Sequence, residues 1–218
     1  VDLDPHGSMS AYFGHDPDAI ELSVYDLFQH QGRVPEDLPR RLIRPTSLAG
    51  LSLIPASTLQ ATLERKMVGV EGMGLVIART LAHLQADFDF VFLDNTPVLG
   101  VLLINALAAS RHILIPVQTE FLALKGLERM LHTLAMVSRS QGREHRYTII
   151  PTLFDRRTHA SVSSFRMLRK TYQDTAWRYA IPVDTKFRDA SRLGVVPSVL
   201  DAQTHGVKAY RRLLDDLL

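Results

Sequence analysis

The sequence predicts an α/β fold in which a mostly parallel sheet is flanked by helices. Segments with strand patterns and segments with helix patterns alternate along the chain, which is typical of parallel sheets with right-handed crossovers. Several short apolar runs lack the alternation of a half-exposed strand, which favours strands buried on both faces. Three of the strand-like segments contain an Ile-Pro pair, at Pro116, Pro151 and Pro182, which predicts three turns at one edge of the sheet.

Composition indicates an ordinary globular protein. The chain has 218 residues, of which 46% are hydrophobic and 22% charged, and we expect one domain over residues 1–218. The sequence has no cysteine, which excludes disulfides and thiolate metal sites. No apolar run is long enough to span a bilayer, so we expect no integral membrane segment. The net charge of +2 is too small to indicate nucleic-acid binding by itself.

The first residues, Val1–Asp4, resemble the end of a buried strand that runs into a turn at Pro5 and Gly7. Asp2 and Asp4 are two positions apart, so they lie on the same face of an extended segment. Two carboxylates at that spacing raise each other's pKa unless a cation lies beside them. The alternative is that one of them caps the following turn or helix.

The next part of the chain predicts short helices joined by proline-containing connections. The expected elements are a helix at Ser23–Gln29, a strand at Leu51–Ser57, a helix at Leu59–Met67, and a helical stripe of Leu75, Ala78, Leu81, Ala82 and Leu84. Gly69, Gly72 and Gly74 are spaced as in a phosphate-binding loop. Because no strand precedes them and no lysine follows at the required place, we interpret them as a connection between helices.

The stretch Phe88–Gly100, FDFVFLDNTPVLG, is the predicted centre of the sheet. Its apolar run ends at Asp94, followed by a turn through Pro97. Ligands of open α/β sheets bind outside the carboxyl ends of the strands, so Asp94 is well placed to hold a magnesium ion or its water beside a phosphate. The alternative is that Asp94 caps the turn or the next helix.

The second half predicts three further strands and the helices between them. The expected elements are a helix at Leu99–Ser110, strands at His112–Glu120, Tyr147–Thr158 and Trp177–Ala190, and helices at Leu122–Arg139 and Ser161–Tyr172. A final helix, VKAYRRLLDDLL, places Val207, Tyr210, Leu213, Leu214 and Leu217 on one face, which predicts docking on the core.

Five ordered motifs resemble a known family. VDLDPHGSMSAYFG resembles the VDLDPQGN segment of ParA/Soj-type partition ATPases, LDNTP resembles their IDTPP, and IPVQTEFLALKGL resembles their IPVQPEYFALEGL. PTLFDRRT is similar to their TMYDxRT, and the segment from IPVDTKFRDASRLG to AYRRL is similar to their last motif. The resemblance covers the whole chain, and the AYFGHDP segment is most similar to ParC-type members that position chemotaxis arrays at cell poles.

The resemblance implies a P-loop NTPase-like fold of the deviant Walker type, as in ParA, Soj and MinD, in which ATP with Mg²⁺ drives formation of a homodimer. It assigns Asp4 to the attacking water, Asp2 to the surroundings of the magnesium ion, and Asp94 to the Walker B acid. This division suits phosphoryl transfer, where positioning and charge neutralisation supply most of the catalysis. The matching positions near the nucleotide are Pro182, Val183 and Asp184, which pack on the adenine, and the turn from Thr152 to Asp155.

Two departures from the family pattern affect these expectations. The KGGVGKT loop that holds the phosphates would lie one strand and one helix before Val1, outside these 218 residues. Without that loop, we expect the chain as printed not to hydrolyse ATP. His6 stands where the family usually has Gln; it either replaces part of the amide's hydrogen bonding or is a tolerated turn residue.

Basic residues collect in the last third of the chain. The resemblance implies that Arg157 and Lys186 face non-specific DNA, and Arg188 and Arg192 extend the same group. The alternatives are a polar or chemotaxis protein partner and a solvated basic face.

The function implied is an ATP-dependent dimerisation switch that positions cellular cargo, either a DNA locus or a polar chemotaxis assembly. It would be cytoplasmic and associated with the nucleoid or the cell pole. The alternative is a non-catalytic scaffold with a degenerate nucleotide fold. A small-molecule enzyme is disfavoured because no paired nucleophile and base can be identified.

Overall fold

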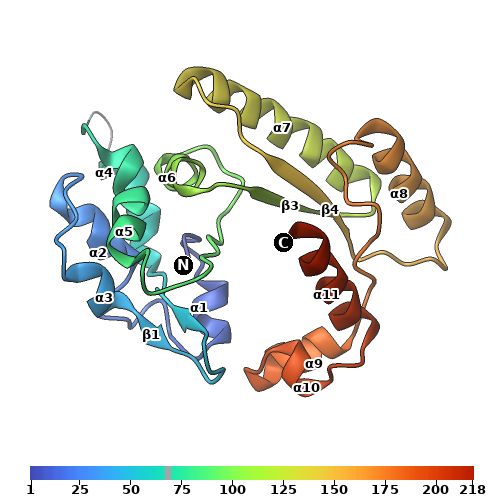
Figure 1. The fold of residues 1–218 in the computed structure, drawn as a ribbon, viewed down its shortest axis with the longest axis horizontal. Coiled ribbons are helices and arrows are strands. Elements are labelled where there is room, and N and C mark those ends of the chain that lie inside the picture. The colour runs from blue at the N-terminus through green and yellow to red at the C-terminus, as the bar shows by residue number, and fades with distance from the viewer. Residues whose placement is uncertain (67–69) are drawn as a thin grey trace. The chain divides into compact units, whose positions relative to one another are not determined.

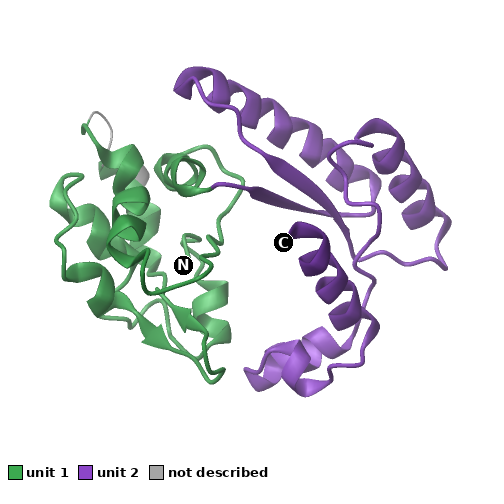
Figure 2. Cartoon of the chain, viewed as in Figure 1, with its two compact units in different colours: residues 1–110 green, residues 111–218 purple. Residues whose placement is uncertain are grey.

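The computed structural model describes residues 1–66 and 70–218. Met67 and Gly69, which the sequence patterns assigned to a helix and to a glycine-rich connection, lie outside the described residues. The chain forms two compact units, residues 1–110 and 111–218 (Figure 2), and each is described by itself. The prediction of a single domain stays a prediction. Within the described ranges, no helix is long and apolar enough to cross a lipid bilayer.

The first unit is mostly helical (Figure 1). Its elements are α1 (Ser8–Tyr12), α2 (Val24–Leu27), η1 (Phe28–His30), α3 (Leu38–Leu42), β1 (Arg44–Pro45), β2 (Ser52–Leu53), η2 (Thr58–Thr62), α4 (Leu63–Lys66), η3 (Met73–Leu75), α5 (Val76–Leu84) and α6 (Val101–Ala109). Strands β1 and β2 form an antiparallel pair. The core includes the buried side chains of Leu3, Leu27, Phe28, Leu42 and Ile77.

Two local interactions explain why helices begin and dock where they do in this unit. A capping box starts α2, because the side chain of Ser23 accepts from the helix and Asp26 accepts from the backbone N–H of Ser23. On α6, the buried amide of Asn105 donates to the carbonyl of Met73 at 2.7 Å and accepts from the N–H of Ile77 at 3.1 Å. These bonds attach α6 to the start of α5.

The second unit contains the parallel pair of strands. Its elements are β3 (Ile113–Gln118), α7 (Phe121–Gln141), β4 (Tyr147–Thr152), α8 (His159–Thr171), α9 (Lys186–Leu193), α10 (Pro197–Leu200) and α11 (His205–Leu217). Strands β3 and β4 pair in register from Ile113 opposite Tyr147 to Gln118 opposite Thr152. The segment after α8 continues the sheet through parallel bridges of Ala176 with Ile149 and of Pro182 with Phe154.

Successive residues of β4 face two different hydrophobic clusters. Ile149 packs with Leu127 of α7 and Leu168 of α8, whereas Ile150 packs with Trp177 and with Leu213 of α11. This is the alternation of a strand buried on both faces. Figure 1 shows the same arrangement, with α7 and α8 on one side of the β3–β4 pair and α11 on the other. The predicted helix-flanked parallel sheet is therefore confirmed in this unit.

The predicted buried strand at Phe88–Leu93 is wrong in its burial. The segment forms no named strand, and Phe90 and Phe92 are 61% and 65% exposed. A central strand needs partners on both edges and cover on both faces. Here the backbone of Phe92 and Asp94 bonds only to the Val1–Leu3 segment within the described residues.

Other element boundaries also differ from the prediction. Pro116 and Pro151 lie inside β3 and β4 instead of in turns. The missing N–H of Pro116 is on the side of β3 that faces away from β4, where proline is tolerated. The strand predicted at Trp177–Ala190 ends near Pro182, since α9 begins at Lys186.

Two helical faces are also shifted from the predicted ones. On α5 the buried residues are Val76, Ile77, Thr80 and Leu84, so of the predicted stripe only Leu84 is buried and Leu81 packs partly buried against the core. On α11, Tyr210 and Leu214 are nearly half exposed, while Val207 and Leu213 are buried. Both helices therefore carry apolar residues that lie outside the buried face and remain exposed to solvent.

Candidate functional site

The site in the first unit is formed where two extended segments end side by side. Asp2 and Asp94 form a parallel bridge, in which the N–H of Leu3 donates to the carbonyl of Asp94 at 2.8 Å and the N–H of Asp94 donates to that of Val1 at 3.0 Å. On the other side, the N–H of Asp2 donates to the carbonyl of Ile54 at 3.0 Å. The bridge brings the predicted residues Asp2, Asp4 and Asp94 together at the carboxyl ends of these segments.

Asp2 is fully buried and its carboxylate is occupied by hydrogen bonds. One oxygen accepts from the N–H of Ser10 at 2.9 Å and from its hydroxyl at 2.7 Å, and the other accepts from the N–H of Asp4 at 3.2 Å. The hydroxyl of Ser10 in turn accepts from the N–H of Ala56 at 2.8 Å. This network attaches α1 and the segment after β2 to the loop that carries Asp4.

Asp4 is partly exposed, with 24% of its side chain accessible. Its Oδ1 accepts from the backbone N–H of His6 at 2.9 Å and lies 2.8 Å from Nδ1 of the His6 ring. Hydrogen bonds within the described residues involve only Oδ1. His6 therefore orients the carboxylate through the same oxygen twice and leaves Oδ2 for another group.

Asp94 is exposed at the end of the second segment, and its pKa is raised. Desolvation by the surrounding protein is the main cause, and the negative charges of Asp2 and Asp4 add to it. The negative charges of Asp2 and Asp4 therefore disfavour ionisation of Asp94 in addition to its desolvation. A cation placed among them would reverse this effect.

The donor chemistry of this site fits Mg²⁺, with one restriction. Mg²⁺ prefers oxygen ligands and is usually held by one or two carboxylates together with phosphates and water. Asp94 and the Oδ2 atom of Asp4 have capacity for such contacts. Asp2 could be a direct ligand only by giving up its buried hydrogen bonds. Within residues 1–66 and 70–218, no group of three or more acidic, His or Cys side chains is arranged to hold a metal unaided.

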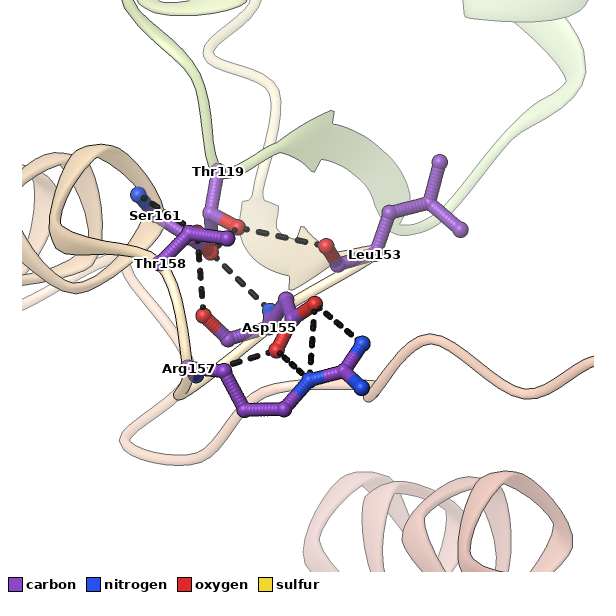
Figure 3. A network of polar contacts seen from close by, with 6 residues as sticks. All are labelled: Thr119, Leu153, Asp155, Arg157, Thr158 and Ser161. Atoms are coloured by element: carbon purple, nitrogen blue, oxygen red, sulfur yellow. Dashed lines mark hydrogen bonds and ion pairs between the residues drawn. The ribbon is translucent and has the colours of Figure 1, made fainter.

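In the second unit, a polar network holds the turn that follows β4 (Figure 3). The hydroxyls of Thr119 and Ser161, both buried, are 2.6 Å apart, and the Ser161 hydroxyl accepts from the N–H of Asp155 at 3.0 Å. The Thr119 hydroxyl also reaches the carbonyl of Leu153 at 3.5 Å. Leu153 has a φ of 49°, which a leucine rarely adopts. The network therefore stabilises a strained backbone conformation at the strand end.

Asp155 is paired with Arg157. The guanidinium donates to both carboxylate oxygens, from Nε at 2.9 Å and from Nη2 at 2.7 Å (Figure 3). These bonds and that of the backbone N–H of Arg157 lower the pKa of Asp155 to about 2. Thus a residue predicted near the nucleotide and a residue predicted on the DNA surface contact each other.

The other residues predicted near the nucleotide lie beside this turn. The carbonyl of Thr152 accepts from the N–H of Thr119 at 3.1 Å. Pro182 bridges to Phe154, and the N–H of Val183 donates to the carbonyl of Phe154 at 3.1 Å. Val183 is 45% exposed, so its apolar surface is open to contact.

Asp184 connects two helices of the second unit. Its carboxylate accepts from the N–H of Lys186 at 3.0 Å and from that of Gly206 at 2.9 Å, at the starts of α9 and α11. Burial opposes ionisation of this carboxyl, but these bonds, one from Thr204 and the charge of His205 outweigh it and lower its pKa.

Three of the predicted basic residues lie on α9. Lys186 is 3.6 Å from Asp189, one turn further along the helix. Arg188 and Arg192 are exposed, are four residues apart on one face of the helix, and form no ion pair within the described part of the chain. Their positive charges are therefore more available to a partner than those of Arg157 and Lys186.

Sequence reasoning missed the residues that support the site. Ser10, Thr119 and Ser161 are polar and buried. Small hydroxyl residues have no distinctive pattern in a single sequence, because the same residues commonly occur in turns and at helix ends. Ser10 alone could have been found from the sequence, because it lies near the start of a helix that directly follows Asp2 and Asp4.

Comparisons with known proteins agree with the motif resemblance. The family model AAA_31, an AAA domain, matches residues 1–146. The chromosome-partitioning ATPase Soj of Treponema pallidum is 30% identical over 219 residues, covering 100% of this chain and 83% of that protein. The sporulation initiation inhibitor protein Soj of Bacillus subtilis is 28% identical over 218 residues, with 100% and 84% covered.

Solved structures show the same fold. Cobyrinic acid a,c-diamide synthase from Mycobacterium smegmatis, with bound ADP and magnesium, has a TM-score of 0.81 at 30% identity, covering 99% of this chain and 79% of that one. The apo McdA structure from Cyanothece has a TM-score of 0.80 at 17% identity, with 95% and 84% covered. From the family model, the relatives and the fold together, the chain belongs to the ParA/Soj/MinD-type deviant Walker ATPases.

Proposed function

We propose that this chain acts in an ATP-dependent dimerisation switch that partitions or positions cellular cargo, either a DNA locus or a polar chemotaxis assembly. The observation that carries the proposal is the parallel bridge of Asp2 with Asp94, which sets Asp4 and Asp94 at adjacent strand ends. The relatives named as Soj include a chromosome-partitioning ATPase, and a similar structure contains ADP and magnesium. ATP and Mg²⁺ are accordingly the ligands proposed for this chain.

The chain's own residues divide the work in this proposal. Asp94 would hold Mg²⁺ or one of its water ligands, and the ion, when bound with ATP, would neutralise charge on the phosphates. Asp4, oriented by His6 through Oδ1, holds the attacking water with Oδ2. Asp2 supports the loop of Asp4 from the buried side. In the second unit, Pro182 and Val183 offer an apolar surface to the adenine, and Thr152 and Asp155 border it.

The phosphate-binding loop is proposed to come from residues other than these 218. Phe90 and Phe92 expose apolar surface just before Asp94, and exposed apolar surface marks a place of contact with another segment or molecule. Sequencing the gene on both sides of this region tests it directly. A KGGxGKT segment ahead of Val1 supports the switch, whereas its absence supports a non-catalytic scaffold.

Dimerisation is tested on a chain that includes that loop. Size-exclusion chromatography with light scattering should give a monomer with ADP and a dimer with ATP and Mg²⁺. A mass that is the same with both nucleotides contradicts the switch. Fluorescence microscopy of the tagged protein beside labelled nucleoids and chemotaxis arrays then distinguishes the two kinds of cargo.

The basic residues give a second test, of the partner. If α9 contacts DNA phosphates, replacing Arg188 and Arg192 with Gln should lower the slope of log affinity against log salt by about two per subunit, since each phosphate contact contributes about 0.9. Replacing Arg157 and Lys186 with Gln should have a smaller effect, because these side chains are paired with acids. If the parental chain and both double variants give the same slope, this surface does not contact DNA phosphates and is better explained by a protein partner.

A further inference from the structure

A groove of about 470 Å³ lies within the second unit, between α8 and α11. This volume is within the range of ligand-binding pockets. The proposed nucleotide site and the basic residues of α9 use none of the residues that line the groove. These are Phe165 of α8, Lys208, Ala209 and Arg212 of α11, Phe154, and the segment Trp177–Ala180.

The walls of the groove are held in place by contacts that need no ligand. The rings of Phe154 and Phe165 pack with their centroids 5.2 Å apart, which attaches α8 to the turn after β4 and forms an apolar wall. On the other side, the indole of Trp177 donates to the carboxylate of Asp216 in α11 at 2.8 Å. The groove is therefore preformed, which lowers the entropic cost of binding.

Three cations and no acidic side chain occur among the described residues that line the groove. The chain bends at Arg178 and Tyr179, and the guanidiniums of Arg178 and Arg212 lie 5.0 Å and 3.3 Å from the centroid of the Tyr179 ring. Arg178 is also 3.7 Å from Asp216. Lys208 is exposed and forms no ion pair in the part of the chain that the structure describes. The positive charge of the groove is therefore only partly balanced.

An apolar wall beside such cations favours a ligand with a bulky apolar side chain flanked by carboxylates. Burying the apolar side chain on the aromatic rings supplies affinity, and guanidiniums form charge-assisted hydrogen bonds with carboxylates. A basic segment is disfavoured by charge. A DNA backbone could pair with the cations, but it has no apolar side chain to cover Phe154 and Phe165.

We propose that this groove binds an acidic segment of a partner protein that carries a bulky apolar side chain. The apolar side chain would lie against Phe154 and Phe165, and the carboxylates would pair with Arg178, Lys208 and Arg212. Because the nucleotide site lies elsewhere in the chain, this proposal does not depend on the ATP-dependent switch.

The fluorescence of Trp177 reports whether the groove is occupied, because Trp177 lines it and is the only tryptophan of the chain. The probe is a capped hexapeptide with a central Leu-Phe pair and two Glu on each side, titrated into the full chain. We expect a saturable change in emission with a Kd below about 1 mM. One control peptide has Lys in place of Glu and another has Ala-Ala in place of Leu-Phe; each should bind at least about tenfold more weakly.

Three variants localise the binding. Ala209→Leu fills part of the groove without changing its charge, in a helix that leucine favours, and should weaken binding at least about tenfold. Lys208→Gln should weaken binding about two- to fivefold, the range for one exposed ion pair. Arg211→Gln removes the same charge from an exposed position of α11 outside the groove and should leave the affinity unchanged.

The proposal is wrong if the Glu peptide leaves the emission of Trp177 unchanged, or if the Lys peptide binds equally well. Equal effects of the variants at Lys208 and Arg211, or an unchanged affinity of folded Ala209→Leu, would also overturn it. Displacement of the bound peptide by random duplex DNA at equal charge concentration would assign the groove to phosphates instead. If Ala209→Leu does not fold, the two control peptides and the two charge variants still decide the matter.

Discussion

The support that Ser10 gives to Asp2 can be tested by replacing it with Ala. This change removes the hydroxyl that donates to the buried Asp2 carboxylate at 2.7 Å and accepts from the N–H of Ala56 at 2.8 Å. A hydrogen bond to a charged group contributes about 1.5–3 kcal/mol, and an unpaired buried N–H costs about 1–3 kcal/mol. The higher helix propensity of Ala offsets about 0.5 kcal/mol. We expect the free energy of unfolding to fall by about 3 kcal/mol.

The assay is urea denaturation of the full chain followed by circular dichroism, with thermal unfolding as a second measurement. A loss of this size should lower the Tm by about 6–12 °C in a protein of this length. Ser8→Ala is the matched control, because Ser8 lies on the same short helix with an exposed side chain. If the free energies of unfolding of Ser10→Ala and Ser8→Ala differ by less than about 0.5 kcal/mol, which is the ordinary range for surface substitutions, Ser10 does not support the site in this way.

Two further predictions concern the backbone and the pH dependence. Gly7→Ala should destabilise the fold by about 2–4 kcal/mol, because its φ is 60° and a Cβ would lie 2.3 Å from the Pro17 ring. Gly14→Ala is the control, because Gly14 has a φ of 83° but open space around it. Its free energy of unfolding, measured by urea denaturation, should fall less than that of Gly7→Ala, since only the positive φ opposes the new side chain. The lowered pKa of Asp184 means that its contribution to stability is complete above its ordinary value of 3.8 and is lost as pH falls through the lowered one. Asp184→Asn should therefore lower the free energy of unfolding at neutral pH, and this free energy should fall less steeply in acid than that of the parental chain. If both proteins lose stability in parallel as the pH falls, this assignment is wrong.

The sequence predicted the fold class and the general position of the acidic site, because both depend on patterns. The apolar run at Tyr147–Thr152 is buried on both faces, as its composition predicts, whereas Ile113–Gln118 buries Ile115 and Val117 on one face and leaves Pro116 and Gln118 exposed on the other. The structure brings two of the predicted acidic residues together, since Asp2 and Asp94 form a parallel bridge.

What the sequence did not predict depends on contacts between distant residues. Phe90 and Phe92 are as apolar as any core strand, but burial depends on what covers them, and no local pattern reports that. Likewise, Asp2 and Asp4 look equivalent in the sequence. Only the fold shows that Asp2 is buried against Ser10 while Asp4 keeps one oxygen open.

The pairing of Asp155 with Arg157 is a similar case. The two residues are separated by one position, a spacing that does not by itself predict a bidentate contact. The contact depends on the strained turn at Leu153, which Thr119 and Ser161 hold in place. A residue-by-residue comparison with a family motif therefore assigns the two side chains to different ligands, although here they bind each other.

We propose that Asp4 positions the attacking water, whereas Asp94 acts with the metal ion. In a chain that carries the phosphate-binding loop, the direct measurement is the ATP turnover rate and the ATP affinity of Asp4→Ala and Asp94→Ala, side by side, with and without Mg²⁺. A group that acts mainly in the transition state should affect turnover far more than binding. We therefore predict that Asp4→Ala slows turnover at least about a hundredfold with nearly unchanged ATP affinity, and that Asp94→Ala also loses the Mg²⁺-dependent part of the affinity. Parental turnover of Asp4→Ala, or an equal loss of ATP affinity in both variants, would contradict the account.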